Sequence, residues 1–472
     1  MLRNFNFSFQ TDEVAGGRGG KGDEVSLRKP IAIARPSRWA WLVFLVIVLP
    51  PVSAGAAPTE AESWNLHFQA TQVFQFKPSF GAAYTGANSL VPERERSRTT
   101  TATLFAGFRP WSGGEIYFNP EMAIGVPFSD MKGVGGFPNG EMQRTAGTDP
   151  TFYRARLFLR QTWGLGGGTA YRESDQNQLA GPVDSNRFVL TLGNIAVLDL
   201  FDGNDYSHDP RRSFMNWSLM TFGAWDYPAD ARGYTWGAAA EYIRPGWALR
   251  AGRFLQPRES NGLQLNPRIM DSYGDVVEYE RAYRLSAQRG RIRLLAFRNE
   301  AGMGSFSAAL AASGPAGAAP DLAATRAPRS KTGFGISAEH GLSDDVGLFL
   351  RASAHDGRTE TYAFTEIDRS VSGGLVFKGA RWQRAGDEAG VAFAVNGLSG
   401  SHRDYLARGG LGFFLGDGRL SYRSEQIAET YYSFKAGKFL WISFDYQHLR
   451  NPGYNADRGP VNFFGLRFHV EI

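Results

Sequence analysis

The end of the chain alternates strictly between apolar side chains and other residues. Phe464, Leu466, Phe468, Val470 and Ile472 form one set, and Gly465, Arg467, His469 and Glu471 form the other. A period of two predicts a β-strand, because successive side chains of a strand point to opposite faces of its sheet. Strands of outer-membrane β-barrels turn an apolar face to lipid and the other face to a wet interior. The stretch therefore favours a membrane barrel, with a strand of a soluble β-sandwich as the alternative.

The same alternation recurs from Trp64 onward, with turn residues between the segments. The clearest segments cover residues 99–110, 115–124, 153–163, 188–194, 234–242, 291–297, 334–339, 346–355, 391–396 and 440–447. They are too short and too regular for helices. About sixteen to eighteen can be placed, and because bacterial barrels have an even number of strands we predict sixteen. The predicted fold class is all-β, a transmembrane antiparallel β-barrel in one domain over residues 58–472, whose last strand closes against the first.

The connections between these segments differ in length. Two connections are short and predict periplasmic turns, at residues 111–114 and 435–438. Three are long and predict extracellular loops, at residues 126–151, 172–185 and 301–331.

The N-terminal region predicts an export signal. Basic Arg35 and Arg38 precede an apolar run from Trp39 to Leu49, and small residues follow up to Ala57. This order is typical of a secretory signal peptide, and a run of about eleven apolar residues falls short of the ~20 that a spanning helix needs. We assign residues 35–57 to a cleaved signal peptide and residues 1–34 to a leader. One explanation of the leader is an over-extended gene, in which the start of translation is placed too early. Export through the periplasm to the bacterial outer membrane follows.

Composition excludes several classes of protein. The chain has no Cys, so disulfides, thiolate metal sites and a cysteine-linked lipid anchor are excluded. Lys and Arg total 51 against 46 acids, and the first 57 residues hold seven bases and four acids. The remainder is almost neutral, which gives no support to nucleic-acid binding.

Several motifs in order along the chain resemble one known family. They are Tyr84-Thr-Gly-Ala-Asn-Ser-Leu90, Glu115-Ile-Tyr-Phe-Asn-Pro-Glu121, Gly136-Phe-Pro-Asn-Gly-Glu141, Arg154-Ala-Arg-Leu-Phe-Leu-Arg-Gln161, Phe214-Met-Asn-Trp217, Trp225-Asp-Tyr-Pro-Ala-Asp230 and Tyr446-Gln-His-Leu-Arg-Asn-Pro-Gly453. With the closing strand, they resemble the carbohydrate-selective, OprB-type porins of the outer membrane. The resemblance implies sixteen strands, passive diffusion of sugars, glucose-like monosaccharides above all, and a constriction lined by arginines and acids. The terminal Ile472 departs from the Phe that barrels usually carry for their assembly machinery.

Charged and amide residues of the polar phase are the candidates for contact with solute. They are Arg109, Glu115, Asn119, Glu121, Arg154, Arg156, Arg160, Arg250, Glu278, Glu280, Arg291 and Arg293. Arg154, Arg156 and Arg160 share parity on one segment, which predicts a ladder of guanidinium groups on one wall, balanced by Glu115 and Glu121. The alternative is that these charges only pair with one another along a wet wall.

Other functions have less support in the sequence. The seven histidines lie in no recognisable nucleophile or metal motif, and we expect no catalysis, cofactor or metal. Glu425 and Glu429 have helical spacing but lie in an alternating segment, so we expect solvated charges. A channel for anionic solutes such as sugar acids or phosphates stays an alternative, as do an outer-membrane hydrolase and an adhesin. Expected partners are small sugars, outer-membrane lipid and the barrel-assembly machinery, with monomer and homotrimer both open.

Overall fold

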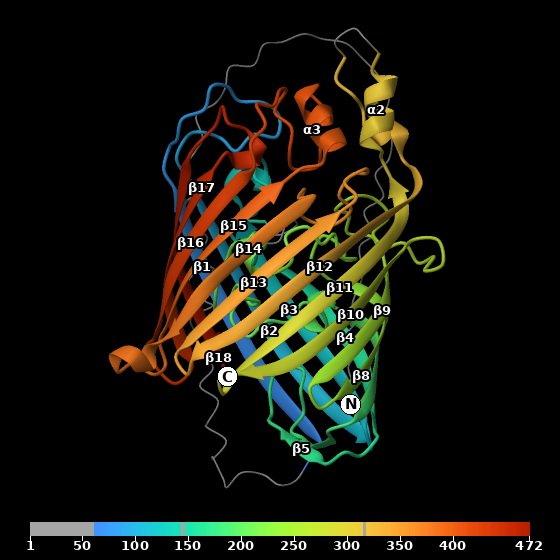
Figure 1. Cartoon of the computed structure of the whole chain (residues 1–472), viewed down its shortest axis with the longest axis vertical. Coiled ribbons are helices and arrows are strands. Elements are labelled where there is room, and N and C mark those ends of the chain that lie inside the picture. The colour runs from blue at the N-terminus through green and yellow to red at the C-terminus, as the bar shows by residue number, and fades with distance from the viewer. Residues whose placement is uncertain (1–60, 143–146, 315–317) are drawn as a thin grey trace, which may run out of the picture. The chain divides into compact units, whose positions relative to one another are not determined.

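Sixteen strands of the chain close into one antiparallel barrel, as predicted (Figure 1). The computed structural model describes residues 61–142, 147–314 and 318–472, so the predicted leader and signal peptide lie outside the described residues. The barrel strands are β1 (Trp64–Lys77), β2 (Glu95–Trp111), β3 (Gly114–Val126), β4 (Thr151–Gly164), β7 (Arg187–Ile195), β8 (Thr235–Arg244), β9 (Trp247–Leu255), β10 (Tyr273–Leu285), β11 (Gln288–Met303), β12 (Ala327–Ser343), β13 (Val346–His355), β14 (Arg369–Lys378), β15 (Glu388–Gly397), β16 (Glu425–Lys435), β17 (Leu440–Arg450) and β18 (Val461–Glu471).

The remaining elements are short. β5 (Thr169–Arg172) and β6 (Gly181–Asp184) form a separate two-stranded sheet. The helices are α1 (Trp217–Met220), α2 (Phe306–Ala312) and α3 (Gly400–Ala407), with 3-10 turns η2 (Phe128–Met131), η3 (Val197–Asp199), η4 (Ala323–Thr325), η5 (Gly379–Trp382) and η6 (Pro452–Tyr454). No helix in the described part of the chain is long and apolar enough to span a bilayer.

The closing strand pairs with the first strand in the register that joins Gln69 to Glu471 and Phe76 to Phe464. Its apolar and polar residues separate as the alternation predicted. Phe464 is exposed on the outer face of the barrel, whereas Arg467 and His469 are buried inside it. Outward aromatic and aliphatic side chains form the lipid-facing surface, because a spanning barrel must turn apolar groups to the hydrocarbon.

Connections alternate between the two ends of the barrel because neighbouring strands are antiparallel. We call the end that carries the turns at 112–113, 245–246, 286–287, 344–345 and 436–439 the short-turn end, and the opposite end the long-loop end. Residues 165–186, which include β5 and β6, connect β4 to β7 and therefore lie at the short-turn end (Figure 1). The prediction that 172–185 is an extracellular loop is wrong, because a two-stranded sheet is inserted into one of the turns.

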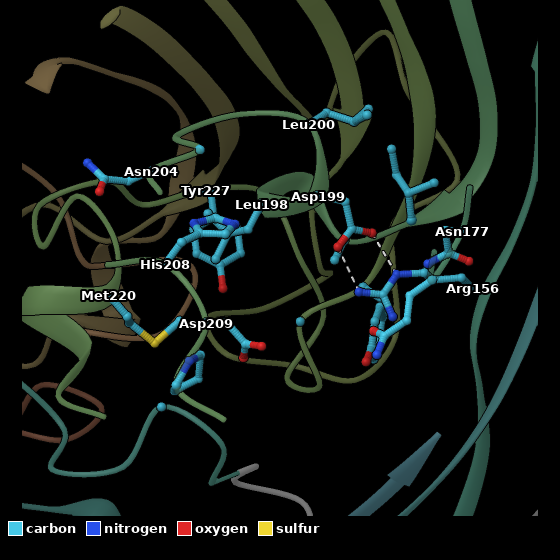
Figure 2. A pocket seen from close by; sticks show the side chains of 18 of the residues that line it. Arg156, Asn177, Leu198, Asp199, Leu200, Asn204, His208, Asp209, Met220 and Tyr227 are labelled. Atoms are coloured by element: carbon cyan, nitrogen blue, oxygen red, sulfur yellow. Dashed lines mark hydrogen bonds and ion pairs between the residues drawn. The ribbon is translucent and has the colours of Figure 1, made fainter. Parts of the chain in front are cut away.

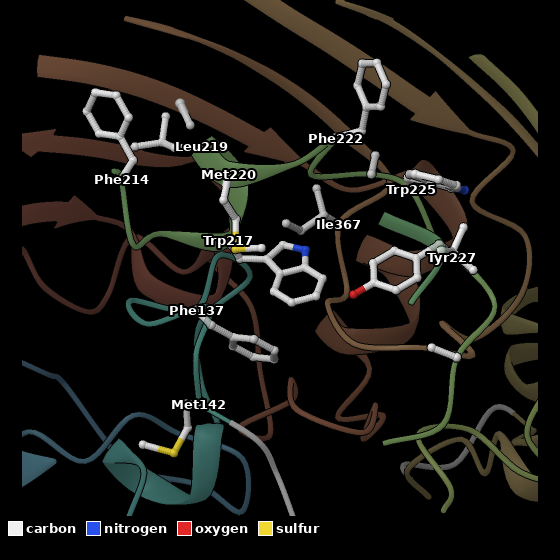
Figure 3. Close-up of a cluster of buried hydrophobic side chains, with 14 of the residues drawn as sticks. Phe137, Met142, Phe214, Trp217, Leu219, Met220, Phe222, Trp225, Tyr227 and Ile367 are labelled. Atoms are coloured by element: carbon white, nitrogen blue, oxygen red, sulfur yellow. The ribbon is translucent and has the colours of Figure 1, made fainter. Parts of the chain in front are cut away.

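The barrel interior is filled by two connections from the long-loop end. Residues 127–142 follow β3, and residues 196–234, which we call the lumen loop, join β7 to β8. Their apolar side chains form a buried cluster inside the barrel (Figure 3), where Phe214 packs against Phe349 of β13 at 5.5 Å between ring centroids. The interior is therefore less wet than the alternation alone predicted, because loop side chains supply a core that strand periodicity cannot reveal.

Candidate functional site

Buried acids on the barrel wall hold the lumen loop by its backbone. Glu278 of β10 accepts a hydrogen bond from the N–H of Asp202 at 2.7 Å. Glu429 of β16 accepts from the N–H groups of Met215 and Asn216 at 2.5 and 2.9 Å. A carboxylate removed from water is stabilised when it accepts several hydrogen bonds, and the loop gains a fixed position in return.

Glu425 and Glu429 are fully buried, so the expectation that they are solvated charges is wrong. Glu425 accepts from the N–H groups of Gly135 and Gly136 at 2.9 and 2.7 Å, in the other connection that enters the lumen. Because Glu425 and Glu429 are four residues apart, both lie on the inner face of β16. Each of them binds the backbone of a different segment in the lumen.

Cations complete the attachment of the lumen loop. Arg351 of β13 donates to a carboxylate oxygen of Asp202 at 3.0 Å and to the carbonyl of Ser207 at 2.6 Å. Lys331 of β12 lies 2.7 Å from Asp226. Both cations are buried, and each is matched by an acid of the loop. Breaking a buried pair on one side is strongly destabilising, so these contacts fix the loop.

A continuous chain of charges follows the wall from β8 to β12. Arg250 lies 3.0 Å from both Glu241 and Glu278, and Arg293 lies 2.8 Å from Glu280 and 3.3 Å from Glu339. Arg291 continues the chain, 2.9 Å from Glu339 and 2.7 Å from Asp205 of the lumen loop. The wall thus presents alternating donors and acceptors at fixed positions. Of the predicted candidates, Arg250, Glu278, Glu280, Arg291 and Arg293 meet here.

Arg156 of β4 and the lumen loop form a second charged contact, on a part of the wall that only β7 separates from β8 (Figure 2). The guanidinium of Arg156 meets the carboxylate of Asp199 through two contacts of 2.6 and 2.7 Å. Arg156 also lies over the ring of Tyr234, 5.3 Å from its centroid. Paired contacts of this kind hold the guanidinium in one orientation toward the passage.

The predicted arginine ladder is broken at Arg154. The pairing of β3 with β4 shifts register between Asn119 and Pro120, whose partners are Arg156 and Arg154, so Ala155 is the extra residue of a β-bulge. Arg154 is therefore turned to the outer face, where its guanidinium lies 5.1 Å from the ring of the exposed Trp236. The prediction that Arg154 shares a lumen face with Arg156 and Arg160 is wrong, because a bulge reverses the parity of a strand.

Glu115 is the centre of a buried ion-pair group near the short-turn end. Its carboxylate lies 3.0 Å from both Arg109 and Arg172, and 3.8 Å from Arg160. Arg172 belongs to β5, and the carbonyl of Asn177 in the same insert accepts from Arg160 at 2.8 Å. The insert therefore reaches the wall from the short-turn end and adds backbone acceptors to the lumen.

Two predicted candidates are buried in the wall. Glu121 accepts hydrogen bonds from Thr103 at 2.6 Å, from Tyr234 at 3.1 Å and from Tyr153. Asn119 is fully buried, and neither of its amide atoms has a hydrogen-bond partner within the described residues. Glu121 therefore positions aromatic side chains and does not border open space.

A cavity of about 790 Å³ lies between the wall, the lumen loop and the short-turn insert. Six of the predicted candidates line it, namely Arg156, Arg160, Arg250, Glu278, Glu280 and Arg293. A second cavity of about 940 Å³ at the short-turn end is lined by Arg291 and Glu339, and Asp205 borders both cavities. Arg109, Glu115, Asn119, Glu121 and Arg154 line neither.

The lining charges of the first cavity are balanced. Its arginines are Arg156, Arg160, Arg172, Arg187, Arg211, Arg232, Arg250 and Arg293, and its acids are Glu141, Asp175, Asp199, Asp205, Asp209, Glu241, Glu278 and Glu280. Burial raises the pKa of Glu141, although Arg211 at 3.0 Å opposes this. Burial would also raise the pKa of Asp209, but Arg211 and a backbone N–H hold it below its usual value.

Aromatic rings form one side of the same cavity. Trp217 and Tyr227 of the lumen loop stack with an interplanar angle of 7° and centroids 6.0 Å apart. Phe364, from the connection between β13 and β14, lies 4.9 Å from Trp217 and 4.8 Å from Tyr227. We call these three residues the aromatic platform. Rings and charges thus border one space, as an amphipathic solute requires.

Sequence reasoning missed the site residues that the lumen loop contributes. Asp199, Asp209, Arg211, Trp217 and Tyr227 line the cavity but belong to no alternating segment. The motifs 214–217 and 225–230 contain Trp217 and Tyr227 and mark the region, although periodicity gave them no role. Within the described residues, no group of three or more His, Asp or Glu side chains is placed to hold a metal ion.

Comparisons with known proteins bear on the fold and the family of the chain. The structure of Pseudomonas putida OprB at high pH superposes with a TM-score of 0.66 at 16% identity, over 87% of this chain and 94% of that one. The outer-membrane channel DcaP of Acinetobacter baumannii gives 0.47 at 9% identity, over 87% and 97%. No curated protein matches the chain in sequence. The family model of the carbohydrate-selective porins matches residues 99–472, and the chain therefore belongs to the OprB family.

Proposed function

We propose that this protein is a passive channel for small neutral carbohydrates, glucose-like monosaccharides above all, across the bacterial outer membrane. Its family and fold are those of a channel. The observation that carries the choice of solute is the cavity of about 790 Å³, which combines balanced charges with the aromatic platform.

The balance of charge favours a neutral solute over an anion. The cavity lining has as many acids as arginines, and each of Arg156, Arg250 and Arg293 lies within 3.0 Å of a carboxylate. A pore selective for anions needs an excess of positive charge along its wall. Paired guanidinium and carboxylate groups instead offer fixed donors and acceptors to hydroxyl groups.

The aromatic platform supplies the complementary contact. A pyranose ring has hydroxyl groups around its edge and C–H groups on its faces. Phe364, which is only partly buried, can contact such a face from the cavity, with the buried Trp217 and Tyr227 packed against it, while the wall charges meet the edge. Each hydrogen bond exchanged with water is worth only about 1 kcal/mol, so the solute can bind and still leave.

The proposal is tested by swelling of liposomes that contain the purified protein. We expect glucose-sized neutral sugars to enter faster than gluconate of similar size. Phe364→Ala should weaken glucose block of single-channel current by up to about tenfold, since an aromatic contact is worth about 0.5 to 1.5 kcal/mol. Phe413→Ala is the matched control, because Phe413 is an exposed phenylalanine outside the cavity.

Three results would contradict the proposal. Absence of swelling with any small solute would remove the channel altogether. Faster entry of gluconate than of glucose would favour the channel for anionic solutes. Equal sugar block in wild type and Phe364→Ala would remove the platform from the mechanism and leave selectivity to the charged wall.

A further inference from the structure

The long-loop end of β2 carries arginines that no acid compensates. Arg94 precedes the strand, and Arg96 and Arg98 lie within it at alternate positions. Arg96 pairs across the sheet with Phe76, and Arg98 pairs with Phe74. Both phenylalanines are exposed on the outer face, so the two arginines of the strand also face outward. We call Arg94, Arg96 and Arg98 the outer arginine ladder.

Acids and arginines alternate over residues 93–96. Of these side chains, only the inward-facing Glu95 forms an ion pair. Glu95 faces the interior, where it lies 3.3 Å from the buried Lys77. The side chains of Arg94, Arg96 and Arg98 make no hydrogen bond, ion pair or ring contact with any residue in the described part of the chain. Successive guanidinium groups on one strand face are rooted about 6.6 Å apart, so an uncompensated ladder repels itself.

Two other outward arginines at the same end are compensated within the protein. Arg253 lies 2.7 Å from Asp275, and Arg298 lies 2.9 Å from Glu300. The outer arginine ladder differs from these two arginines, since its counter-charge must come from outside the chain.

The height of the ladder matches the boundary of the apolar band. Along β2 the residues that follow with the same parity are Thr100, Ala102, Leu104, Ala106 and Phe108. Arg98 and Phe108 are ten residues apart, about 33 Å along the strand, which a tilt of about 40° reduces to about 25 Å across the membrane. An apolar band of a bacterial barrel is about 25 Å tall. Arg98 thus lies where hydrocarbon gives way to headgroups, with Phe74 and Phe76 beside it.

We propose that the outer arginine ladder binds the phosphate groups of an anionic glycolipid of the lipid A type in the outer leaflet. Guanidinium groups bind phosphate oxygens through paired donors, and the adjacent phenyl rings contact the acyl chains. Long loops mark the outward end of a bacterial barrel, which places the ladder in that leaflet. The site is independent of the passage of solute through the lumen.

The test is native mass spectrometry of the delipidated full-length protein, titrated with bisphosphorylated lipid A and with the same lipid after removal of its phosphates. Wild type should bind the phosphorylated form more tightly. R94Q/R96Q/R98Q should bind it about a hundredfold more weakly, because each basic group near a charged lipid surface contributes a factor of about five. R94K/R96K/R98K keeps the charge and should retain most of the affinity.

The matched control is R244Q/R281Q. Arg244 and Arg281 are exposed on either side of Trp247 at the short-turn end, on the outer face of the same barrel. This variant should bind lipid A as wild type does.

Several outcomes would overturn the proposal. They are equal binding of both lipids by wild type, unchanged binding by the glutamine variant, and equal loss in the control. Full displacement of lipid A by 10 mM inorganic phosphate would identify a site for free anions. A change in oligomeric mass of the lipid-free glutamine variant, with lipid binding intact, would identify a contact between copies of the chain. The two-lipid comparison uses wild type alone, so it decides the matter even where a variant does not fold.

Discussion

Arg156 on the barrel wall and Asp199 on the lumen loop are joined by two contacts, Nε to Oδ2 at 2.6 Å and Nη2 to Oδ1 at 2.7 Å. The pair borders the cavity, whereas other anchors of the same loop, such as Arg351 with Asp202, are buried behind it, and Glu278 both holds the loop and borders the cavity. Several contacts that fix the loop therefore lie away from solute, while the pair of Arg156 and Asp199 lies at the passage. Charge at the passage can be changed without releasing the loop.

Asp199→Asn should make the channel more selective for anions. The substitution removes one acid from a balanced lining and leaves the guanidinium of Arg156 without its carboxylate. An unpaired charge a few ångströms from a passing ion in water contributes about 1 kcal/mol, so the anion-to-cation permeability ratio should rise by up to about fivefold. Reversal potentials across a salt gradient measure this ratio. Asp271→Asn, at an exposed ion pair with Arg268, is the control, and an equal shift in both variants would contradict the assignment.

Phe444→Arg should impair folding of the barrel much more than Gln426→Arg. Phe444 is exposed in the middle of β17, and Gln426 is exposed near the long-loop end of the neighbouring β16. A cation on the lipid face costs about 2 to 4 kcal/mol at the midplane of the bilayer and about 0 to 1 kcal/mol near its surface. Folding yield into lipid vesicles, read from the heat-modifiable band, gives the comparison. Similar yields would mean that the depth of Phe444 in the membrane is assigned incorrectly.

The sequence predicted the barrel well because lipid imposes a period of two. On β3 and β18 the predicted phase is confirmed at the buried Glu115 and Arg467 and at the exposed Phe464. The prediction failed for Arg154 because a bulge adds one residue without any change of composition that would reveal it. Neighbouring Ala155 gives no such signal, since alanine is common in regular strands.

The site was predicted only in part because the lumen loop obeys no period. Trp217 and Tyr227 lie in the lumen because Glu278, Glu429 and Arg351 bind their loop, and these contacts join residues that are far apart in sequence. The wall charges appear in the sequence as polar-phase residues. Which of them border open space and which hold the loop depends on the path of the loop, and alternation carries no information about that path.

Protection of the connection around Phe414 should fall as the pH rises above about 4. One oxygen of Glu366 accepts hydrogen bonds from the N–H groups of Phe414 and Leu415, at 2.8 and 2.7 Å. Burial raises the pKa of Glu366, with His402 and these N–H groups opposing the shift. Below the unfolded pKa of about 4.3 both states are protonated and no stability is lost. Above it the unfolded segment releases its proton first, so stability falls until the pH passes the raised pKa of the folded state.

Hydrogen exchange of residues 411–416, corrected for intrinsic rates, measures that protection. Glu366→Gln keeps an oxygen acceptor but has no proton to release, so its protection should be flat over the same range. Burial would raise the pKa of Asp368, but His402 lowers it below its usual value. Asp368 therefore titrates at a lower pH than Glu366. Amides of β15 serve as an internal control. A wild-type profile as flat as that of the variant would contradict the role of Glu366.

Removal of the short-turn insert should enlarge the passage while the barrel still folds. β4 and β7 pair down to Gly164 and Arg187, so an Asn-Gly turn in place of residues 165–186 can join the two strands directly. The deletion removes Arg172 and Asn177 from the cavity lining. Glu115 loses Arg172 but keeps Arg109 at 3.0 Å, so its buried carboxylate is still paired.

Single-channel conductance should therefore rise. Block by glucose should weaken, because Arg160 loses the carbonyl of Asn177 that holds it in the intact protein. The matched control replaces residues 379–387 by the same Asn-Gly turn. Lys378 and Glu388 are paired there, and the replaced residues line neither cavity, so conductance should stay at the wild-type value. Unchanged conductance in the first deletion would mean that the insert does not narrow the route. A rise in both deletions would mean that any shortened turn loosens the barrel, and the insert would then have no specific part in selectivity.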